Sequence, residues 1–451
     1  MTKLSHYNHF YPWQAGLHIA YNARSGAVGL LDDANMTTFQ SLAAKLSHNG
    51  GGTALSEKES ELLKQLKYGQ FVCDDNLDER ASLRFRHQMD RFVTNALGLV
   101  LAPTMACNMA CTYCFETNTT SRMRPQVIEA ILTLVEQQAP ALRSVSVCWY
   151  GGEPLLAMDI IEDLSETILD LAEERNLEFD ASIISNGVLL TPSTVDKLVR
   201  WKVKTAQITL DGPARVHDRT RPLKNGQSSF STIVENIRYA IERMGVTIRI
   251  NIDRNHTPDI IEELLVELTE AGLREKVSIY FGRIEPASTV CQNIAESCYD
   301  IGDFAAVETT YFDLLFKHGF RIDKLPSPIS VICMAQLVNS FLIDADGYHY
   351  RCFNHVGDRE KAVGSILEPI DYQHPNFMRL FEFDPFTSTE CASCDVLPLC
   401  MGGCPARRID QHQAGQPACE SWKHNLQPML EIIAKSKQQE YQRQAAAAAK
   451  E

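Results

Sequence analysis

The stretch ACNMACTYCFE, residues 106–116, places three cysteines at Cys107, Cys111 and Cys114. Cysteine thiolates hold iron–sulfur clusters, and in a cubane cluster each of the four irons takes a ligand. Three thiolates therefore leave one iron open, so that a small substrate can chelate it and receive an electron from it. The alternative is a structural zinc site, but zinc usually takes four ligands from paired Cys-x2-Cys knuckles, and this spacing is uncommon there.

The composition around this stretch is that of a globular chain. With 451 residues, 45% of them apolar, the chain is long enough for two or three domains. A net charge of −14 argues against nucleic acid as the main partner, because binding a phosphate backbone needs a basic surface. The sequence has no secretory signal and no run of about 18 apolar residues, so we expect a cytoplasmic protein that does not enter a membrane.

Metal ligation is the expected use of most of the fourteen cysteines, because a reducing cytosol keeps thiols out of disulfides. Ten of the fourteen fall into two groups, at residues 107–114 and 333–419. The other four are Cys73, Cys148, Cys291 and Cys298. We expect Cys73 and Cys148 to be small buried hydrophobic residues.

Residues 1–95 carry no metal motif and read as strands followed by helices. Two short strands flank the turn formers of 22–26, and helical patterns follow at 36–46 and 57–69. Ser56, with Glu59 three residues later, has the pattern of a capping box. We interpret this segment as a winged-helix-like module whose edge strand pairs with an extended peptide. The alternative is an N-terminal extension without that role.

From residue 96 to 300 the pattern alternates between strands and amphipathic helices, which predicts a parallel α/β sheet with right-handed crossovers. Six such units make a partial, open (β/α)6 barrel. Catalytic groups in such folds gather at the C-terminal ends of the strands, and the cysteine motif follows the first strand. The expected strands are 98–104, 144–150, 179–185, 205–210, 246–252 and 277–284.

Polar and glycine residues follow the later strands. Glycines let a backbone approach a ligand closely, and hydroxyl and amide side chains suit a ribose or a carboxylate. The structural alternatives are a helix cap at Ser185 and a turn at Asp211. The polar, basic loop 219–230 either contacts a peptide substrate or is solvated. The candidate binding residues are Gly151, Gly152, Glu153, Pro154, Ser185, Asn186, Asp211, Arg249 and Asn251.

A second cysteine-rich unit is expected at 333–425. A bridging region, 301–332, precedes it, and an exposed, fraying helix or tail, 426–451, follows it. Its cysteines occur as a single cysteine, then Gly-x4-Cys, then Cys-x2-Cys-x5-Cys-x3-Cys, and then a last cysteine. These seven cysteines are more than one metal site needs. Two zinc knuckles are the alternative to iron–sulfur clusters. The cysteines are Cys333, Cys352, Cys391, Cys394, Cys400, Cys404 and Cys419.

The Cys-x3-Cys-x2-Cys motif, with Tyr113 before its last cysteine, resembles the cluster motif of the radical SAM enzymes. The resemblance implies that S-adenosylmethionine binds the open iron of a 4Fe-4S cluster and is split reductively to a 5′-deoxyadenosyl radical. In that family the motif matching residues 151–154 holds the amino group of the methionine moiety. The positions matching Ser185, Asn186, Asp211, Arg249 and Asn251 face the cofactor or substrate.

The cysteine order of 333–419 resembles the SPASM domain, which carries two auxiliary 4Fe-4S clusters. The family's assignment gives the first auxiliary cluster Cys333, Cys352 and Cys404. It gives the second Cys391, Cys394, Cys400 and Cys419. The first set is one thiolate short, since position 339 is Asn339 where some members have a cysteine. The fourth ligand of this cluster stays open: it is Cys291, Cys298 or a substrate thiolate, or there is none.

Together these features resemble the radical SAM/SPASM peptide maturases, with a module similar to their leader-peptide recognition domain. The resemblance implies three 4Fe-4S clusters, S-adenosylmethionine, a ribosomally made precursor peptide with a leader, and a low-potential donor such as flavodoxin or ferredoxin. The implied product is an oxidative crosslink, either a thioether or a carbon–carbon or carbon–oxygen bond as in a cyclophane. The precursor, the residues joined and the oligomeric state stay open.

Three alternatives remain. Anaerobic sulfatase-maturing enzymes use the same clusters to make formylglycine, but a catalytic Asp follows their Gly-x4-Cys cysteine where this chain has Phe353. They also lack a long N-terminal module. Asp358 and Asp395 are the candidates to replace that Asp in this chain. A non-enzymatic electron-transfer protein would leave the motifs at 151–154 and 185–187 without a purpose. A peptide epimerase would need a hydrogen donor in place of an oxidising relay.

Overall fold

The computed structural model describes residues 2–47, 54–114, 116, 119–285, 295–411 and 418–448. The chain forms two compact units, each built from separate stretches of sequence. The larger unit consists of Phe92–Asp323 and Cys333–Glu382. The smaller unit consists of Met1–Arg91, Lys324–Ile332 and Phe383–Glu451. The cysteine-rich stretch 333–425 therefore contributes to both units.

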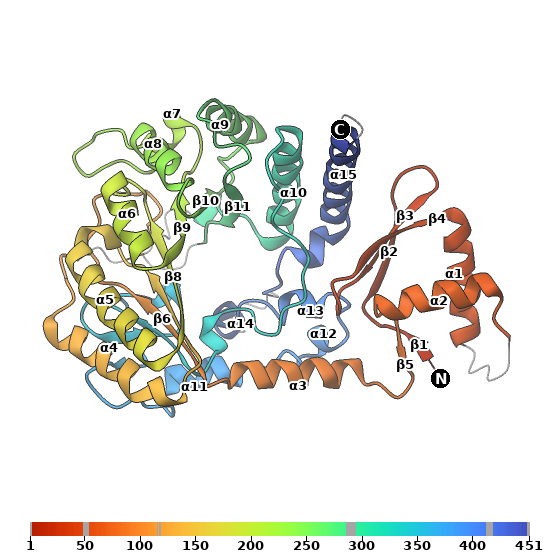
Figure 1. The fold of residues 1–451 in the computed structure, drawn as a ribbon, viewed down its shortest axis with the longest axis horizontal. Coiled ribbons are helices and arrows are strands. Elements are labelled where there is room, and N and C mark those ends of the chain that lie inside the picture. Colours follow the sequence, from red (N-terminus) through yellow and green to blue (C-terminus); the bar gives the residue numbers. More distant parts are fainter. Residues whose placement is uncertain are drawn as a thin grey trace. The chain divides into compact units, whose positions relative to one another are not determined.

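A parallel sheet forms the centre of the larger unit (Figure 1). Six of its strands lie in the order β11-β10-β9-β8-β7-β6, each parallel to its neighbours. These are the six strands that the sequence predicts, with ends that agree within three residues. Their bounds are β6 Ala96–Leu101, β7 Ser144–Trp149, β8 Glu178–Ser185, β9 Val203–Thr209, β10 Gly245–Ile252 and β11 Ser278–Arg283.

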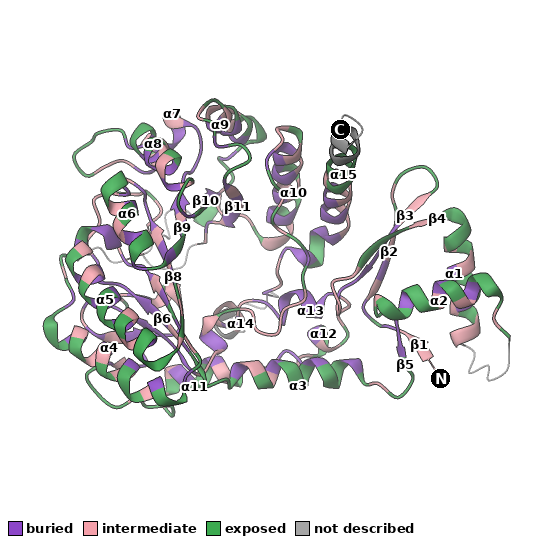
Figure 2. Cartoon of the chain, in the orientation of Figure 1, coloured by how far each residue is buried: buried purple, intermediate pink, exposed green. Residues whose placement is uncertain are grey.

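Amphipathic helices connect these strands and pack on the sheet (Figure 2). Ile131 and Leu164, on two successive helices, are fully buried, whereas the outer faces of these helices are exposed. This burial is what the 3.6-residue apolar pattern predicts. The helices are α4 Pro125–Gln138, α5 Met158–Arg175, α6 Pro192–Arg200, α7 Ala214–Thr220, α8 Phe230–Ala240, α9 Pro258–Glu270, α10 Ile301–Lys317 and α11 Pro375–Glu382, with short 3-10 turns η1 Ala139–Ala141 and η2 Pro154–Ala157.

Three strands from beyond residue 339 extend the same sheet, which the sequence does not predict. β12 Ser340–Ile343 pairs parallel to β6, and the antiparallel strands β13 Tyr348–Tyr350 and β14 Gly364–Ser365 follow it. Three short 3-10 turns lie around them, η4 Met334–Gln336, η5 Phe353–His355 and η6 Arg359–Lys361.

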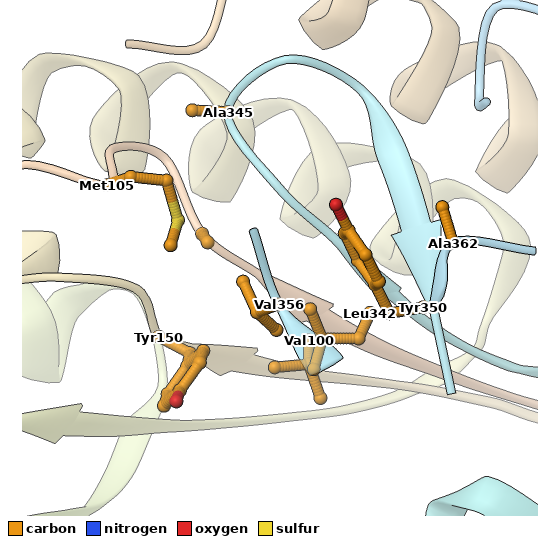
Figure 3. Packing of buried hydrophobic residues seen from close by; sticks show 9 residues of the cluster. Val100, Met105, Tyr150, Leu342, Ala345, Tyr350, Val356 and Ala362 are labelled. Atoms are coloured by element: carbon orange, nitrogen blue, oxygen red, sulfur yellow. The ribbon is translucent and has the colours of Figure 1, made fainter. Parts of the chain in front are cut away.

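An apolar cluster packs the added strands onto the parallel part of the sheet (Figure 3). It joins Met105, just before the cysteine motif, and Tyr150, just after β7, to Val356, just after Cys352. Burial of apolar surface stabilises such a cluster by about 25 cal/mol per Å² removed from water. The cysteine motif and the segment after β13 are therefore held on one common core.

The smaller unit begins with antiparallel strands, and the sequence predicts two of them, those that flank residues 22–26. β2 Asn8–Pro12, β3 Leu17–Asn22 and β4 Val28–Asp32 form one sheet, and β1 Thr2–Leu4 pairs with β5 Val72–Asp74. The helices are α1 Asp33–Ser47, α2 Glu57–Tyr68 and α3 Glu79–Arg91. The expected capping box is confirmed, because Ser56 and Glu59 exchange both hydrogen bonds at the start of α2.

The C-terminal part of the smaller unit is helical, with α12 Thr389–Ala392, α13 Leu397–Cys400, α14 Pro405–Gln411 and α15 Trp422–Ala448. The expectation of an exposed helix after residue 425 is wrong for its first turns. Met429, Leu430 and Ile433 are buried, because apolar residues there recur at helical spacing. None of the helices in the described ranges combines the length and apolarity needed to cross a bilayer.

Candidate functional site

A cavity of about 560 Å³ opens at the C-terminal ends of the parallel strands of the larger unit. Most of the residues that the sequence singles out for the cluster and cofactor line it, although they come from four different strand ends. They are Cys107, Cys111, Tyr113, Cys114, Gly151, Gly152, Ser185, Asn186, Arg249 and Asn251. Glu153, Pro154 and Asp211 do not line the cavity; all three are buried behind it.

The loop 219–230 holds the cysteine motif in place, rather than being only a solvated or peptide-binding loop. The Ala110 N–H donates to the carbonyl of Pro222 at 2.9 Å. The Thr112 N–H donates to the carbonyl of Thr220 at 3.0 Å. The motif has little regular structure of its own, so these backbone bonds fix its course.

The three thiols of the motif are half-buried. Burial raises the pKa of Cys107 to about 11 and that of Cys114 to about 12, and it also raises the pKa of Cys111. A thiol of this kind loses its proton when its sulfur binds a metal. Within the described ranges, no three Cys, His, Asp or Glu side chains converge as ligands of one metal ion do. A cubane spreads its thiolates over four irons, and three thiols around one cavity fit that donor set.

A buried network fixes Tyr113, the aromatic residue of the motif. Its hydroxyl donates to the Asp211 carboxylate and accepts from Arg221 Nη1 at 2.6 Å and from Asn251 Nδ2 at 2.9 Å. Asp211 is 0% exposed, and its other carboxylate oxygen accepts from the Asn251 backbone N–H at 3.0 Å. Asp211 therefore positions Tyr113, Arg221 and Asn251, each of which lines the cavity.

Gly151 and Gly152 bring the chain after β7 against the loop that leads into the motif. A Cβ on Gly152 would lie 2.4 Å from the carbonyl oxygen of Ala106, which is far inside contact distance. A Cβ on Gly151 would lie 2.4 Å from the carbonyl oxygen of Thr104, and Gly151 has a φ of 122°. Both positions require glycine, because a side chain at either would push the motif away.

Glu153 ties two strand ends together. Its carboxylate accepts from the Ser185 hydroxyl at 2.9 Å, from the Asn186 N–H at 2.8 Å and from the Leu155 N–H at 3.1 Å. Asn186 in turn donates to the side-chain oxygen of Asn108 at 2.7 Å. Glu153 therefore positions the side chains that reach the motif, and its own carboxylate is fully occupied within the protein.

Glu153 also makes a pH-dependent contribution to stability. Burial raises its pKa from 4.5 to about 6, against the opposing hydrogen bonds from Asn186, Leu155 and Ser185. The shift corresponds to about 2 kcal/mol. Because the folded-state pKa is raised, this stabilisation is fully present below pH 4.5 and is lost as the pH rises through 6.

We therefore expect the difference in unfolding free energy between wild type and Glu153→Gln to change by about 2 kcal/mol between pH 4.5 and pH 7. Wild type should lose that amount relative to the variant over this range. Urea titrations of the apoprotein at several pH values measure it. Glu129→Gln, at an exposed position on α4, is the control and should show no such change. A pH-independent difference for Glu153→Gln would contradict the prediction.

One wall of the cavity, formed by β9, β10 and β11, carries a chain of hydrogen-bonded side chains. Arg249 donates to the Asn251 side chain at 2.7 Å and to the Tyr280 hydroxyl at 3.2 Å. Tyr280 donates to the Gln207 side-chain oxygen at 2.8 Å. Sequence reasoning finds Arg249 and Asn251 at this wall but not Gln207, because an isolated Gln on a strand carries no signal.

Other lining residues were also missed. Arg283 and Glu285, at the end of β11, form an ion pair. Phe353 packs edge to face against Tyr150, with ring centroids 4.9 Å apart. The lining residues without a sequence prediction as cofactor-binding groups are Glu116, Tyr150, Ile184, Gln207, Thr209, Arg221, Arg283, Ile284, Glu285, Phe353 and Asn354.

Four of the C-terminal cysteines, those assigned by resemblance to the second auxiliary cluster, lie in the smaller unit with two cations. Arg408 donates to Cys391 Sγ at 3.2 Å, and Lys423 donates to Cys394 Sγ at 3.5 Å. Burial raises the pKa of Cys400 to about 12 and also raises that of Cys419, with Cys391 and Cys394 as the nearest thiolates acting on both. Four thiols with neighbouring cations fit an anionic thiolate-bound cluster.

The cysteines assigned to the first auxiliary cluster belong to different units. Cys333 and Cys352 lie in the larger unit and Cys404 in the smaller one. Among the candidates for a fourth ligand, Cys298 is half-buried, and Cys291 lies outside the described residues.

Comparison with known proteins finds a family match over the parallel sheet of the larger unit. Residues 101–282 match the model of the Radical SAM superfamily. A cysteine-type anaerobic sulfatase-maturating enzyme of Clostridium novyi is 24% identical over 365 residues, which cover 73% of this chain and 94% of that protein. The mycofactocin maturase MftC of Mycolicibacterium smegmatis is 25% identical over 354 residues, which cover 72% of this chain and 82% of MftC. A protein of Synechocystis is 29% identical over 181 residues, and this match spans only 42% of its length.

Solved structures share the fold at lower identity. Native anSMEcpe with bound AdoMet and Kp18Cys peptide superposes with a TM-score of 0.59 and 21% identity, covering 76% of this chain and 99% of that one. Streptococcus suis SuiB bound to the precursor peptide SuiA gives a TM-score of 0.53 and 17% identity, covering 93% of this chain and 99% of SuiB.

Proposed function

The chain is an enzyme with a radical SAM domain and has maturases among its homologues, and we propose that it modifies a ribosomally synthesised precursor peptide by closing an oxidative intramolecular crosslink. The observation that carries the proposal is one cavity in which the three cysteines of the motif meet residues from the ends of the five other parallel strands. The crosslink is a thioether or a carbon–carbon or carbon–oxygen bond.

Cys107, Cys111 and Cys114 hold a 4Fe-4S cluster in this proposal, with S-adenosylmethionine beside it. When bound, the two supply a 5′-deoxyadenosyl radical that removes a hydrogen atom from the peptide. Backbone groups at Gly151 and Gly152, which line the cavity, are proposed to receive the ammonium of the cofactor.

Arg221 is the cation that the cavity offers to the carboxylate of the cofactor. It is 8% exposed, it lines the cavity, and it is held by Tyr113 and by Asp211, whose Oδ2 lies 3.8 Å from its Nη1. A charge fixed in this way costs little reorganisation when the anion binds. Arg249 and Asn251, both on β10, are then left for the ribose and the substrate.

Closing a crosslink removes two hydrogen atoms from the peptide. One leaves with 5′-deoxyadenosine, and the other leaves as a proton and an electron. Two auxiliary 4Fe-4S clusters provide the route for that electron in our proposal. Cys333, Cys352 and Cys404 hold one, with its fourth ligand open, and Cys391, Cys394, Cys400 and Cys419 hold the other.

The peptide is proposed to bind by its leader to the N-terminal module of residues 1–95, whose three-stranded sheet ends in the exposed strand β4. An exposed edge strand accepts an extended peptide through backbone hydrogen bonds. SuiB, which shares the fold over 93% of this chain, was solved with a precursor peptide bound, and that agrees with this choice. Flavodoxin or ferredoxin is the proposed electron donor.

Formylglycine formation, as in the sulfatase-maturating relatives, is the second candidate. The relation to such an enzyme over 94% of its length favours it. The position that follows Cys352 favours the crosslink, because Phe353 lines the cavity there and offers no base. Asp358 does not line the cavity and instead caps the turn η6. Glu285, in its ion pair with Arg283, is a carboxylate that does line it.

Mass spectrometry of the anaerobically reconstituted enzyme, incubated with S-adenosylmethionine, a reductant and the short peptide encoded next to its gene, tests the proposal. We expect 5′-deoxyadenosine and a peptide lighter by two hydrogen atoms, with fragmentation locating the bond. A reaction without S-adenosylmethionine is the control. A new aldehyde at a cysteine or serine would establish the second candidate instead. Deoxyadenosine formed with the peptide mass unchanged would argue for epimerisation.

A further inference from the structure

Arg351 is a buried cation without an acidic partner. It lies between β13 and Cys352, its side chain is 1% exposed, and its Nε atom has no hydrogen-bond partner. No Asp or Glu of the described residues forms an ion pair with it, and the Cys333 thiolate is the anionic group with the largest effect on it. Burying an unpaired charge costs several kcal/mol, and proteins therefore pair such charges.

The guanidinium holds the chain that follows Cys333. Its Nη2 donates to the carbonyl oxygens of Met334 at 3.1 Å and Ala335 at 3.3 Å, and also to that of Leu337. Its Nη1 donates to the carbonyl of Ser340, the first residue of β12. One side chain adjacent to Cys352 thus fixes the segment that leaves Cys333, so the positions of both cysteines depend on it.

Two aromatic rings of α11 complete the enclosure. The guanidinium carbon lies 4.8 Å from the ring centroid of Phe377 and 5.4 Å from that of Phe381. Cation–π contacts stabilise a desolvated cation, but neither they nor neutral carbonyls cancel its net charge. The buried positive charge of Arg351, next in the chain to Cys352 and bonded to the segment after Cys333, would therefore be stabilised by an anion bound at these two cysteines.

We propose that Arg351 is a positioning residue and the fixed counter-charge of the cluster held by Cys333 and Cys352. This inference rests on the proposed function, because it assumes the first auxiliary cluster. A thiolate-bound cubane carries net negative charge, and reduction adds to it. A nearby cation stabilises the reduced form more than the oxidised one and so raises the reduction potential. Arg351 thereby makes this cluster a better acceptor for the electron that crosslink closure releases.

Potentiometric titration of the reconstituted holoenzyme, followed by electron paramagnetic resonance, tests this role. S-adenosylmethionine alters the signal of the motif cluster only, which separates it from the other two. In Arg351→Met we expect one auxiliary potential to become more negative while the other stays constant. Arg351→Lys keeps the charge but not the carbonyl bonds, so its potential should stay near wild type while iron content falls. Arg359→Met, which removes an exposed arginine from the same segment, should change neither.

Iron content and circular dichroism show whether a variant is loaded with clusters and folded, so that loss of either is not mistaken for a change in potential. Unchanged potentials in a folded, fully loaded Arg351→Met enzyme would overturn the inference and leave the proposed function intact. An equal negative shift in Arg351→Lys would also overturn it, because the charge would then not be the cause. If Arg351→Met does not fold, Arg351→Gln, which removes the charge but keeps a hydrogen-bond donor, is judged by the same criterion. Equal iron content in wild type and Cys333→Ala would instead remove the first auxiliary cluster from the proposed function.

Discussion

Replacement of Cys111 with alanine is expected to abolish the formation of 5′-deoxyadenosine. Cys111 lies between the other two cysteines of the motif and lines the same cavity. Losing one of three thiolates leaves two irons of a cubane without a protein ligand, so the cluster should not assemble in a form that binds the cofactor. Iron analysis and chromatography of the reaction products measure the two effects, and we expect no product above the level without enzyme.

The matched control is Cys394→Ala in the smaller unit. Cys394 belongs to a different set of thiols, whose neighbour is Lys423, and does not line the cavity. Cleavage of S-adenosylmethionine should therefore continue in part without modifying the peptide, and the crosslinked product should be lost. Equal uncoupled cleavage in Cys111→Ala and Cys394→Ala would contradict the division of labour between the two sets of cysteines.

The parallel sheet could be predicted from the sequence because its signals are local. Each of the six strands is a short apolar run followed by an amphipathic helix, and each appears where the pattern places it. The motifs at 107–114 and 151–152 follow strand ends, so their meeting in one cavity follows from the parallel topology. The tight approach at Gly152 likewise follows from a glycine pair at a strand end.

The residues that sequence reasoning missed depend on contacts between distant parts of the chain. Arg221 contacts Tyr113 across 108 positions, and no local pattern marks such a pair. The sequence predicts Glu153 as a cofactor-binding residue, and only the fold shows that its buried carboxylate also joins two strand ends through hydrogen bonds. The added strand β12 is four residues long, too short for a reliable periodic signal.

The loss of Arg221 is the other change with a large expected effect, and it acts in two separable ways. Asp211 is fully buried, so Arg221→Met leaves its charge without a cation and should cost about 3–5 kcal/mol of unfolding free energy. The cavity also loses the cation proposed for the cofactor carboxylate. A hydrogen bond to a charged group contributes about 1.5–3 kcal/mol, so the Kd for S-adenosylmethionine should rise roughly 10- to 100-fold.

The double variant Arg221→Met/Asp211→Asn separates these effects. Neutralising Asp211 removes the unpaired charge, so much of the lost stability should return in urea titrations, whereas affinity for S-adenosylmethionine should stay low. Tyr113→Phe, which removes only the hydroxyl that both side chains contact, should have the smallest effect on binding. Calorimetry of the reconstituted variants measures the affinities. If the double variant regains affinity along with stability, Arg221 serves the fold alone. The carboxylate of the cofactor must then be bound by another cationic group of the cavity, such as Arg249.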